Sequence, residues 1–352
     1  MKFERRAAPY IAPKATVASV MRQVLYALIP AVLAHIWYFG AGIVFNLFIA
    51  SLFCLGGEAA MLRIRGKPVA STLADYSALV TAAILAFALP PLTPWWVTAS
   101  AALFGIVVAK HLYGGLGFNI FNPAMAGYVV VLVAFPVYLN FWPAPRIGDL
   151  DAYYPTILET AQYTLTGSLP AHLTYDAVAR ATPLDAVKSG LNAMYTFAEL
   201  RAFPTMGSFG GRGWEWISTF IALGGIWLLI QKVIRWHIPL GVFAGLLLPT
   251  TIMNIFQAGV SPSPGFHLFS GGVALCAFFV ATDPVSAATS TKGRFVYGFG
   301  IGVLIFAIRT WGSYADGVAF SVILMNLAVP AIDYVTKPRI VGHERKRGGQ
   351  GG

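Results

Sequence analysis

The sequence predicts an all-α polytopic membrane protein, because of its composition, its long apolar stretches and the placement of its basic residues. Hydrophobic residues make up 57% of the 352 residues, charged residues make up only 11%, and the mean hydropathy is +0.69. Soluble domains carry about 25% charged residues. This composition therefore excludes an ordinary soluble domain.

The chain contains enough apolar stretches for about ten transmembrane helices. A helix needs about 20 residues to cross the hydrocarbon core of a bilayer. One long polar stretch, residues 141–213, divides the apolar stretches into two groups of five. The expected spans are 20–39, 42–61, 73–90, 95–112, 122–141, 214–233, 238–256, 267–282, 294–311 and 316–335.

The basic residues predict which side of the membrane each segment faces. With the N-terminus inside, 18 of the 24 Lys and Arg residues fall in cytoplasmic segments, Lys110 among them. Cytoplasmic loops carry an excess of Lys and Arg. We therefore expect a cytoplasmic leader (1–19), a basic cytoplasmic tail (337–352) and a non-cytoplasmic 141–213 segment. The net charge of +10 comes from bases at membrane borders, so the expected contact is membrane lipid and not nucleic acid.

An internal repeat is visible at an offset of 193 residues. This offset places Pro91 on Pro284, Phe104 on Tyr297 and Gly105 on Gly298. The copies are five spans apart, which is an odd number, so they would have opposite orientations. We expect two inverted five-helix repeats, at 20–140 and 214–336, as in many transporters.

The segment between the repeats is expected to be an ordered cap, since it contains more bulky aromatic residues than a disordered linker. At its centre, Thr182-Pro183-Leu184-Asp185 has the pattern of a helix N-terminus: a capping hydroxyl, a proline at the first position and an acid at the third. The cap explains Thr182 without any further function. A phosphate attached to the same hydroxyl would meet free backbone N–H groups and the positive end of the helix dipole.

Polar residues at predicted helix breaks form a second group of candidates. Each could simply cap a helix end, or it could belong to an ion path or a cofactor site, because ionisable groups inside a membrane are costly. The main candidates are Asn119, Asn122, Asp283 and Asp316, with Glu58 and Asp75 as weaker ones.

Cysteine and histidine give no sign of a metal centre. Cys54 and Cys276 lie in separate apolar stretches, as small core residues do. Two cysteines cannot build a Cys-ligated iron–sulfur cluster. The six histidines show no paired metal-ligand spacing, so no metal site is predicted.

Three segments resemble the membrane-subunit family shared by the Rnf electron-transport complex and the sodium-pumping quinone reductase. They are 111–127 (HLYGGLGFNIFNPAMAG), 279–286 (FVATDPVS) and 316–326 (DGVAFSVILMN). The resemblance covers nearly the whole chain. It is closer to the RnfD proteins of Rnf complexes than to the NqrB proteins of the quinone reductase.

The resemblance implies a covalent flavin on the segment between the repeats. In this family FMN is held by a phosphoester to the Thr of an Asp-x-x-Ser-Gly-Ala-Thr-like motif. Asp176 matches the leading acid, Ala181 the Ala and Thr182 the flavinylated Thr. Ala179-Arg180 replaces Ser-Gly, and Arg180 could pair with the phosphate.

The resemblance also implies partners and a cellular location. The chain would belong to a six-membered complex, together with the A, B, C, E and G proteins, in the bacterial inner membrane, with 141–213 in the periplasm. A flavin transferase would attach the FMN, and riboflavin could be a second flavin. The complex would link NADH and ferredoxin, and this chain would not be catalytic alone. The alternative from the residues alone is an inverted-repeat channel or transporter without a redox role.

Overall fold

The computed structural model describes residues 16–147 and 152–337. Most of the predicted leader (1–19) and tail (337–352) lies outside the described residues. The described part contains helices and two isolated bridges but no β-strand. The fold is therefore helical, as the composition predicts.

Six helices within the described residues are long and apolar enough to cross a membrane. They are α1 (Val17–Phe39), α2 (Gly42–Ile64), Trp95–Leu112, α13 (His237–Phe256), α16 (Thr291–Trp311) and α17 (Val318–Thr336). The third of these consists of α5 (Trp95–Leu103) and the π-helical η1 (Phe104–Leu112). Three shorter apolar helices are α4 (Ser77–Ala88), α6 (Pro123–Ala134) and α12 (Trp214–Ile230).

Two predicted spans are interrupted, because the backbone cannot continue as a helix there. The span expected at 122–141 ends as α6, and α7 (Pro136–Leu139) follows from Pro136, whose ring disfavours a helical residue before it. The span expected at 73–90 begins only at Ser77. The short α3 (Val69–Leu73) precedes it, and Tyr76 between them has a left-handed conformation (φ 64°).

The eighth expected span, 267–282, is wrong as a single helix. It consists of α14 (Pro264–Phe269), α15 (Val273–Leu275) and the π-helical η2 (Cys276–Val280). The break lies at Gly271, whose φ of +69° is open to glycine and strained for other residues. The described residues therefore do not form ten continuous helices.

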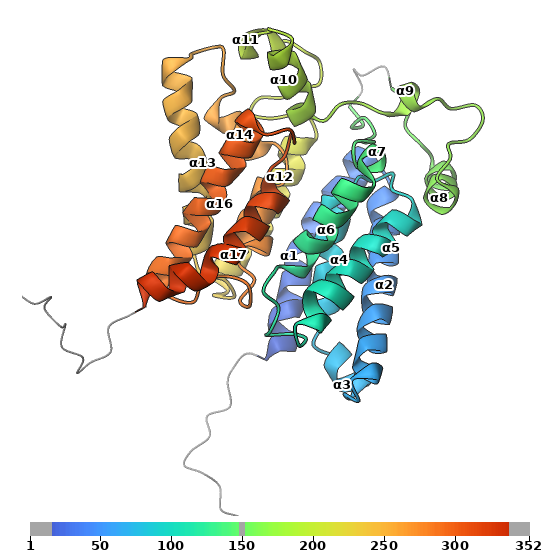
Figure 1. Ribbon diagram of the computed structural model, residues 1–352. Coiled ribbons are helices and arrows are strands. Elements are labelled where there is room, and N and C mark those ends of the chain that lie inside the picture. Colours follow the sequence, from blue (N-terminus) through green and yellow to red (C-terminus); the bar gives the residue numbers. More distant parts are fainter. Residues whose placement is uncertain (1–15, 148–151, 338–352) are drawn as a thin grey trace, which may run out of the picture.

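The helices form two bundles that lie side by side (Figure 1), one from α1 to α7 and one from α12 to α17. A shift of 193 residues carries α1 (17–39) onto 210–232, which covers α12. The same shift carries α2 (42–64) onto 235–257, which covers α13. The inverted orientation of these copies stays a prediction.

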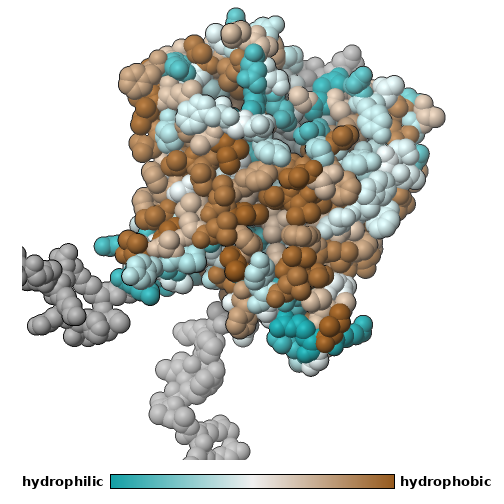
Figure 2. All heavy atoms as spheres, viewed as in Figure 1, coloured by the Kyte–Doolittle hydropathy of each residue, from teal (hydrophilic) through white to brown (hydrophobic). Residues whose placement is uncertain are grey.

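Apolar side chains form a broad band between two hydrophilic ends of the molecule (Figure 2). Above this band, at the end opposite to both described chain ends, lie α9 (Tyr175–Val178), α10 (Pro183–Asn192) and α11 (Phe197–Leu200), while α8 (Ile157–Thr166) lies lower, beside the first bundle (Figure 1). Two small cores hold them. Tyr163 and Val178 pack with Leu92 and Phe141 on the first bundle, and α10 and α11 pack over Phe266 of the second.

The two bundles approach most closely where α12 crosses α1. A Cβ placed on Gly224 would lie 2.1 Å from the carbonyl oxygen of Ala27, so only glycine permits this contact. Small residues allow such backbone contact between membrane helices.

We predict that Gly224→Ala destabilises the protein by about 1–3 kcal/mol, the usual cost of overpacking. The control is Gly56→Ala in α2, where a Cβ meets nothing within 4 Å. The measurement is the apparent melting temperature of each variant in detergent. Equal melting temperatures for the two variants would contradict the close contact between α1 and α12.

Candidate functional site

Thr182 is the N-cap residue of α10, as its local sequence predicts. Its Oγ1 accepts a hydrogen bond from the backbone N–H of Asp185 (3.2 Å) and donates to Asp185 Oδ2 (2.5 Å). Pro183 occupies the first helical position. The hydroxyl is half-buried and held in one place, at the start of a ten-residue helix.

The segment that leads to Thr182 is bound to the chain that leaves the first bundle. The backbone N–H of Arg180 donates to the Trp142 carbonyl (2.9 Å), and that of Ala144 donates to Val178 (3.2 Å). Thr182 therefore lies where the backbone segment bonded to the first bundle continues into α10, which packs on the second bundle.

The other residues of the predicted flavin motif precede Thr182 in the chain. Asp176 and Ala181 are exposed. The Arg180 guanidinium donates to the carbonyls of Asp176 (2.7 Å) and Ala179 (2.9 Å). These two bonds hold the Arg180 side chain against the backbone of residues 176–179.

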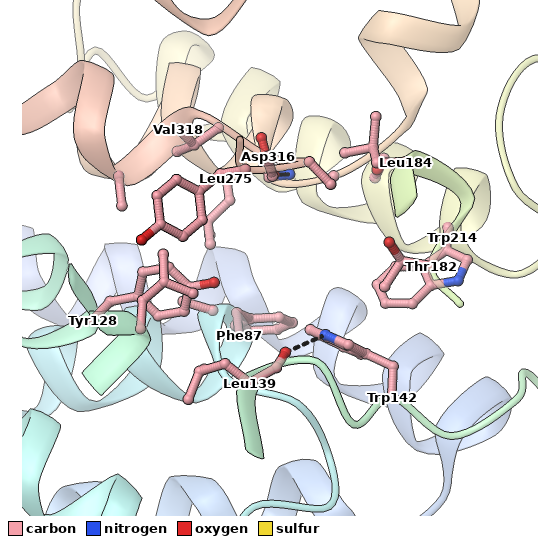
Figure 3. A pocket seen from close by; sticks show the side chains of 18 of the residues that line it. Phe87, Tyr128, Leu139, Trp142, Thr182, Leu184, Trp214, Leu275, Asp316 and Val318 are labelled. Carbon is pink, nitrogen blue, oxygen red and sulfur yellow. Dashed lines mark hydrogen bonds between the residues drawn. The ribbon is translucent and has the colours of Figure 1, made fainter. Parts of the chain in front are cut away.

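A cavity of about 170 Å³ begins at Thr182 and extends between the two bundles. In Figure 3, Thr182, Trp142 and Trp214 lie toward one end of the cavity, and Tyr128 and Val318 lie toward the other. Trp142 is fixed by a hydrogen bond from its Nε1 to the Leu139 carbonyl (3.1 Å). The walls come from both halves of the chain and are mainly apolar, and their aromatic members are Phe87, Tyr128, Trp142, Trp214 and Tyr314.

One buried polar atom on the cavity wall has no partner. His35 lines the cavity and is 2% exposed, and its Nδ1 finds no hydrogen bond among the described residues. Buried polar groups normally have partners. The His35 ring therefore keeps one unused hydrogen-bonding atom, which lies beneath the cavity surface.

The carboxyl group beside Thr182 has a perturbed environment. Burial raises the pKa of Asp185, and the nearby Asp316 carboxylate raises it further, while the hydrogen bond from Thr182 opposes the shift. Both carboxylates line the cavity. Asp185 is thus easier to protonate than an ordinary aspartate.

α10 is tied to the second bundle by Lys188. Its ammonium donates to the carbonyls of Tyr314 (2.8 Å), Arg309 (3.3 Å) and Ile308 (3.4 Å) at the end of α16. Burial lowers the pKa of Lys188. These bonds satisfy carbonyls that a helix C-terminus leaves free.

Asp316, predicted as part of an ion or second-flavin path, has a structural role at the break after α14. It accepts from the Gly272 N–H (2.7 Å) and from Arg309 Nη2 (3.0 Å). Arg309 also donates to the carbonyls of His267 (2.7 Å) and Ser270 (2.9 Å). The pair therefore supplies the bonds that the broken helix lacks.

The other three residues predicted for that path lie elsewhere. Asn119, Asn122 and Asp283 line a separate cavity of about 120 Å³ that does not include Asp316. Asn122 caps α6 through Met125 N–H (3.1 Å), and its own backbone N–H donates to Asn326 Oδ1 (3.1 Å). Asp283 accepts from Ser286 Oγ (2.9 Å). Capping is thus confirmed for Asn122, and the four candidates do not form one site.

The structure buries Lys110, which was counted among the basic residues of cytoplasmic segments. It lies in η1 and is 1% exposed, and its Nζ contacts Glu58 Oε1 (2.6 Å) and Ser77 Oγ (2.7 Å). Ser77 Oγ in turn donates to Asp75 (2.6 Å). The signal for this cluster was Glu58 itself, because a carboxylate in an apolar stretch needs a cation nearby.

Comparison with known proteins gives the family. The profile of the NQR2, RnfD, RnfE family matches residues 4–342. The chain belongs to this family. Its relatives include proteins described as the D subunit of an ion-translocating oxidoreductase complex. Identity is 49% with that of Ectopseudomonas mendocina, over 99% of this chain and 98% of the relative. It is 45% with that of Vibrio cholerae and 41% with that of Citrobacter koseri, each over 97% of this chain and all of the relative.

The Lys110–Glu58 pair generates a stability prediction. Lys110→Met leaves the Glu58 carboxylate buried without its cation and should cost about 3–5 kcal/mol. The double variant Glu58→Gln, Lys110→Met removes both charges and should recover most of this loss. Melting temperatures in detergent measure both. A double variant no more stable than Lys110→Met would show that the two charges do not depend on each other.

Proposed function

We propose that the chain is the membrane subunit of an Rnf-type complex and carries electrons through FMN esterified to Thr182. Its relatives are named as subunits of an ion-translocating oxidoreductase complex. The observation that most supports the flavin is the position of Thr182, a fixed hydroxyl at the rim of a cavity that Trp142 and Trp214 also line.

The start of α10 suits a phosphoester. Backbone N–H groups of the first helical turn and the helix dipole favour a phosphate there. Once Thr182 is esterified, it has no proton to donate to Asp185. The hydrogen bond that opposes the rise in the Asp185 pKa is then lost. Arg180, two residues away, adds positive charge.

The cavity suits the ring of the flavin. Trp142 and Trp214 line the end near Thr182, where an aromatic ring system can pack against them. The carboxyl groups of Asp185 and Asp316 line the same cavity and supply hydrogen-bonding groups. When bound, FMN supplies transfer of one or two electrons. A tether keeps it at high local concentration.

The remaining parts of the proposal concern the assembly. The chain works with the A, B, C, E and G proteins of the complex, and a flavin transferase attaches the FMN on the periplasmic face of the inner membrane. Electron flow through the complex is coupled to ion movement across the membrane. The cavity lined by Asn119, Asn122 and Asp283 is the candidate place for a second flavin such as riboflavin.

We predict that Thr182→Ala abolishes covalent flavin. The measurements are in-gel ultraviolet fluorescence of the denatured chain and its intact mass, which in the wild type exceeds the sequence mass by one FMN less one water. The matched control is Thr196→Ala, since Thr196 is likewise an N-cap threonine on this side, bonded to the Glu199 N–H. Both changes should cost about 1 kcal/mol of stability.

The control should keep its fluorescence. A dark wild-type band, from cells that contain the flavin transferase, would instead favour a channel or transporter without a redox role.

The proposed topology is tested separately by labelling introduced cysteines with a membrane-impermeant maleimide. Ser189→Cys in α10 and Ser71→Cys in α3 are exposed positions at opposite ends of the molecule (Figure 1). Ser189→Cys should react in spheroplasts, and Ser71→Cys only in inside-out vesicles. The reverse pattern would place Thr182 in the cytoplasm and contradict the proposal.

A further inference from the structure

Helix α8 buries two of its threonines and exposes three of its large apolar side chains. Thr160 and Thr164 are buried, and their hydroxyls donate to the carbonyls of Thr156 and Thr160 (2.8 Å each) within the same chain segment. Ile157, Leu158 and Leu165 point outward and are 67%, 82% and 67% exposed. A helix surrounded by water has the opposite arrangement.

The outward side chains of α8 lie on one face. Residues 157, 161 and 165 are four apart and share a helix face, and Leu158 flanks it. Gln162 and Thr166 lie on the next flank and are exposed as well. The helix thus has three sides: one packed on the protein, one apolar and one polar.

The apolar side of α8 continues the lipid-facing surface of the first bundle. α8 packs beside α2 (Figure 1), whose outward residues Phe48 and Leu52 are 66% and 56% exposed. Its C-terminal Gly167 lies against Trp96: a Cβ there would be 2.3 Å from the ring. Trp95, the next aromatic, is 40% exposed. Tryptophans of this kind mark the level where the bilayer meets water.

We propose that α8 is an interfacial helix that inserts Ile157, Leu158 and Leu165 into the outer leaflet of the membrane. An interfacial helix lies in the membrane plane with its apolar side buried about 5–10 Å and its polar side in water. The three sides of α8 and its position beside Trp95 and Trp96 fit this arrangement. The proposal does not depend on the flavin.

Anchored in this way, α8 fixes the distance between the membrane surface and the segment that carries Thr182. Glu159 accepts from Tyr153 Oη (2.9 Å) and contacts His172 Nε2 (2.9 Å). The Tyr153 N–H donates to the Ala177 carbonyl (3.0 Å), five residues before Thr182. Hydrogen bonds at the helix start, above all with the backbone of Thr156, lower the pKa of Glu159 to about 2. The carboxylate therefore stays ionised and keeps these bonds at physiological pH.

The test is the environment of a nitroxide spin label on each flank of α8. Leu158→Cys and Gln162→Cys are made in the full chain, whose natural Cys54 and Cys276 are fully buried. The chain is placed in phospholipid nanodiscs, and the label's collision rates with oxygen, which concentrates in lipid, and with a water-soluble nickel chelate are measured. The oxygen-to-nickel ratio should be several-fold higher at residue 158 than at residue 162.

Equal ratios, with nickel access at both positions, would place α8 in water and overturn the proposal. Protection of residue 158 from both reagents, in the chain alone or in the assembled complex, would assign this face to a protein contact and overturn it equally. Leu165→Cys is the second site on the apolar flank. It should give the same result as Leu158→Cys, and it replaces that variant if Leu158→Cys does not fold.

Discussion

The guanidinium of Arg309 is the contact on which the outer end of the second bundle depends. It bonds the carbonyls of His267 and Ser270 and the carboxylate of Asp316, so one side chain joins the broken helix to α16 and to the start of α17. Inside a membrane, free backbone groups cannot bond to water. An interrupted helix is stable there only when such a side chain replaces the missing bonds.

The residues around Arg309 and Asp316 also support the candidate flavin site. Asp316 lines the cavity beside Thr182, and Lys188 binds the carbonyls that end α16. α10 is therefore bonded to the backbone of Arg309, whose side chain stabilises the break at Gly271. The position of the Thr182 hydroxyl is a property of the membrane domain beneath it, and not of the outer segment alone.

Local patterns in the sequence were sufficient to predict part of this structure. Thr182 and Asn122 each precede a proline and cap a helix. Both caps could be predicted because a capping bond involves only the next three residues. Composition was sufficient for the helical membrane fold. The three segments that resemble the family led to the same family as the comparison of the whole chain.

The features that sequence reasoning missed depend on partners far away in the chain. Lys110 was counted among the basic residues of cytoplasmic segments, and its burial could not be foreseen because its partner Glu58 is 52 positions away in the chain. The apolar run 267–282 reads as one helix, since nothing local shows that Arg309 and Asp316 will support a break. Likewise, the spacing of Asn119, Asp283 and Asp316 cannot reveal that they line two different cavities.

The walls of the Thr182 cavity come from both bundles: His35 and Trp142 from one, Trp214 and Asp316 from the other. Neither half of the chain encloses this space by itself. Although the sequence hints at an ancestral duplication, a gene cut between the halves would yield two products that must reassemble before the cavity exists.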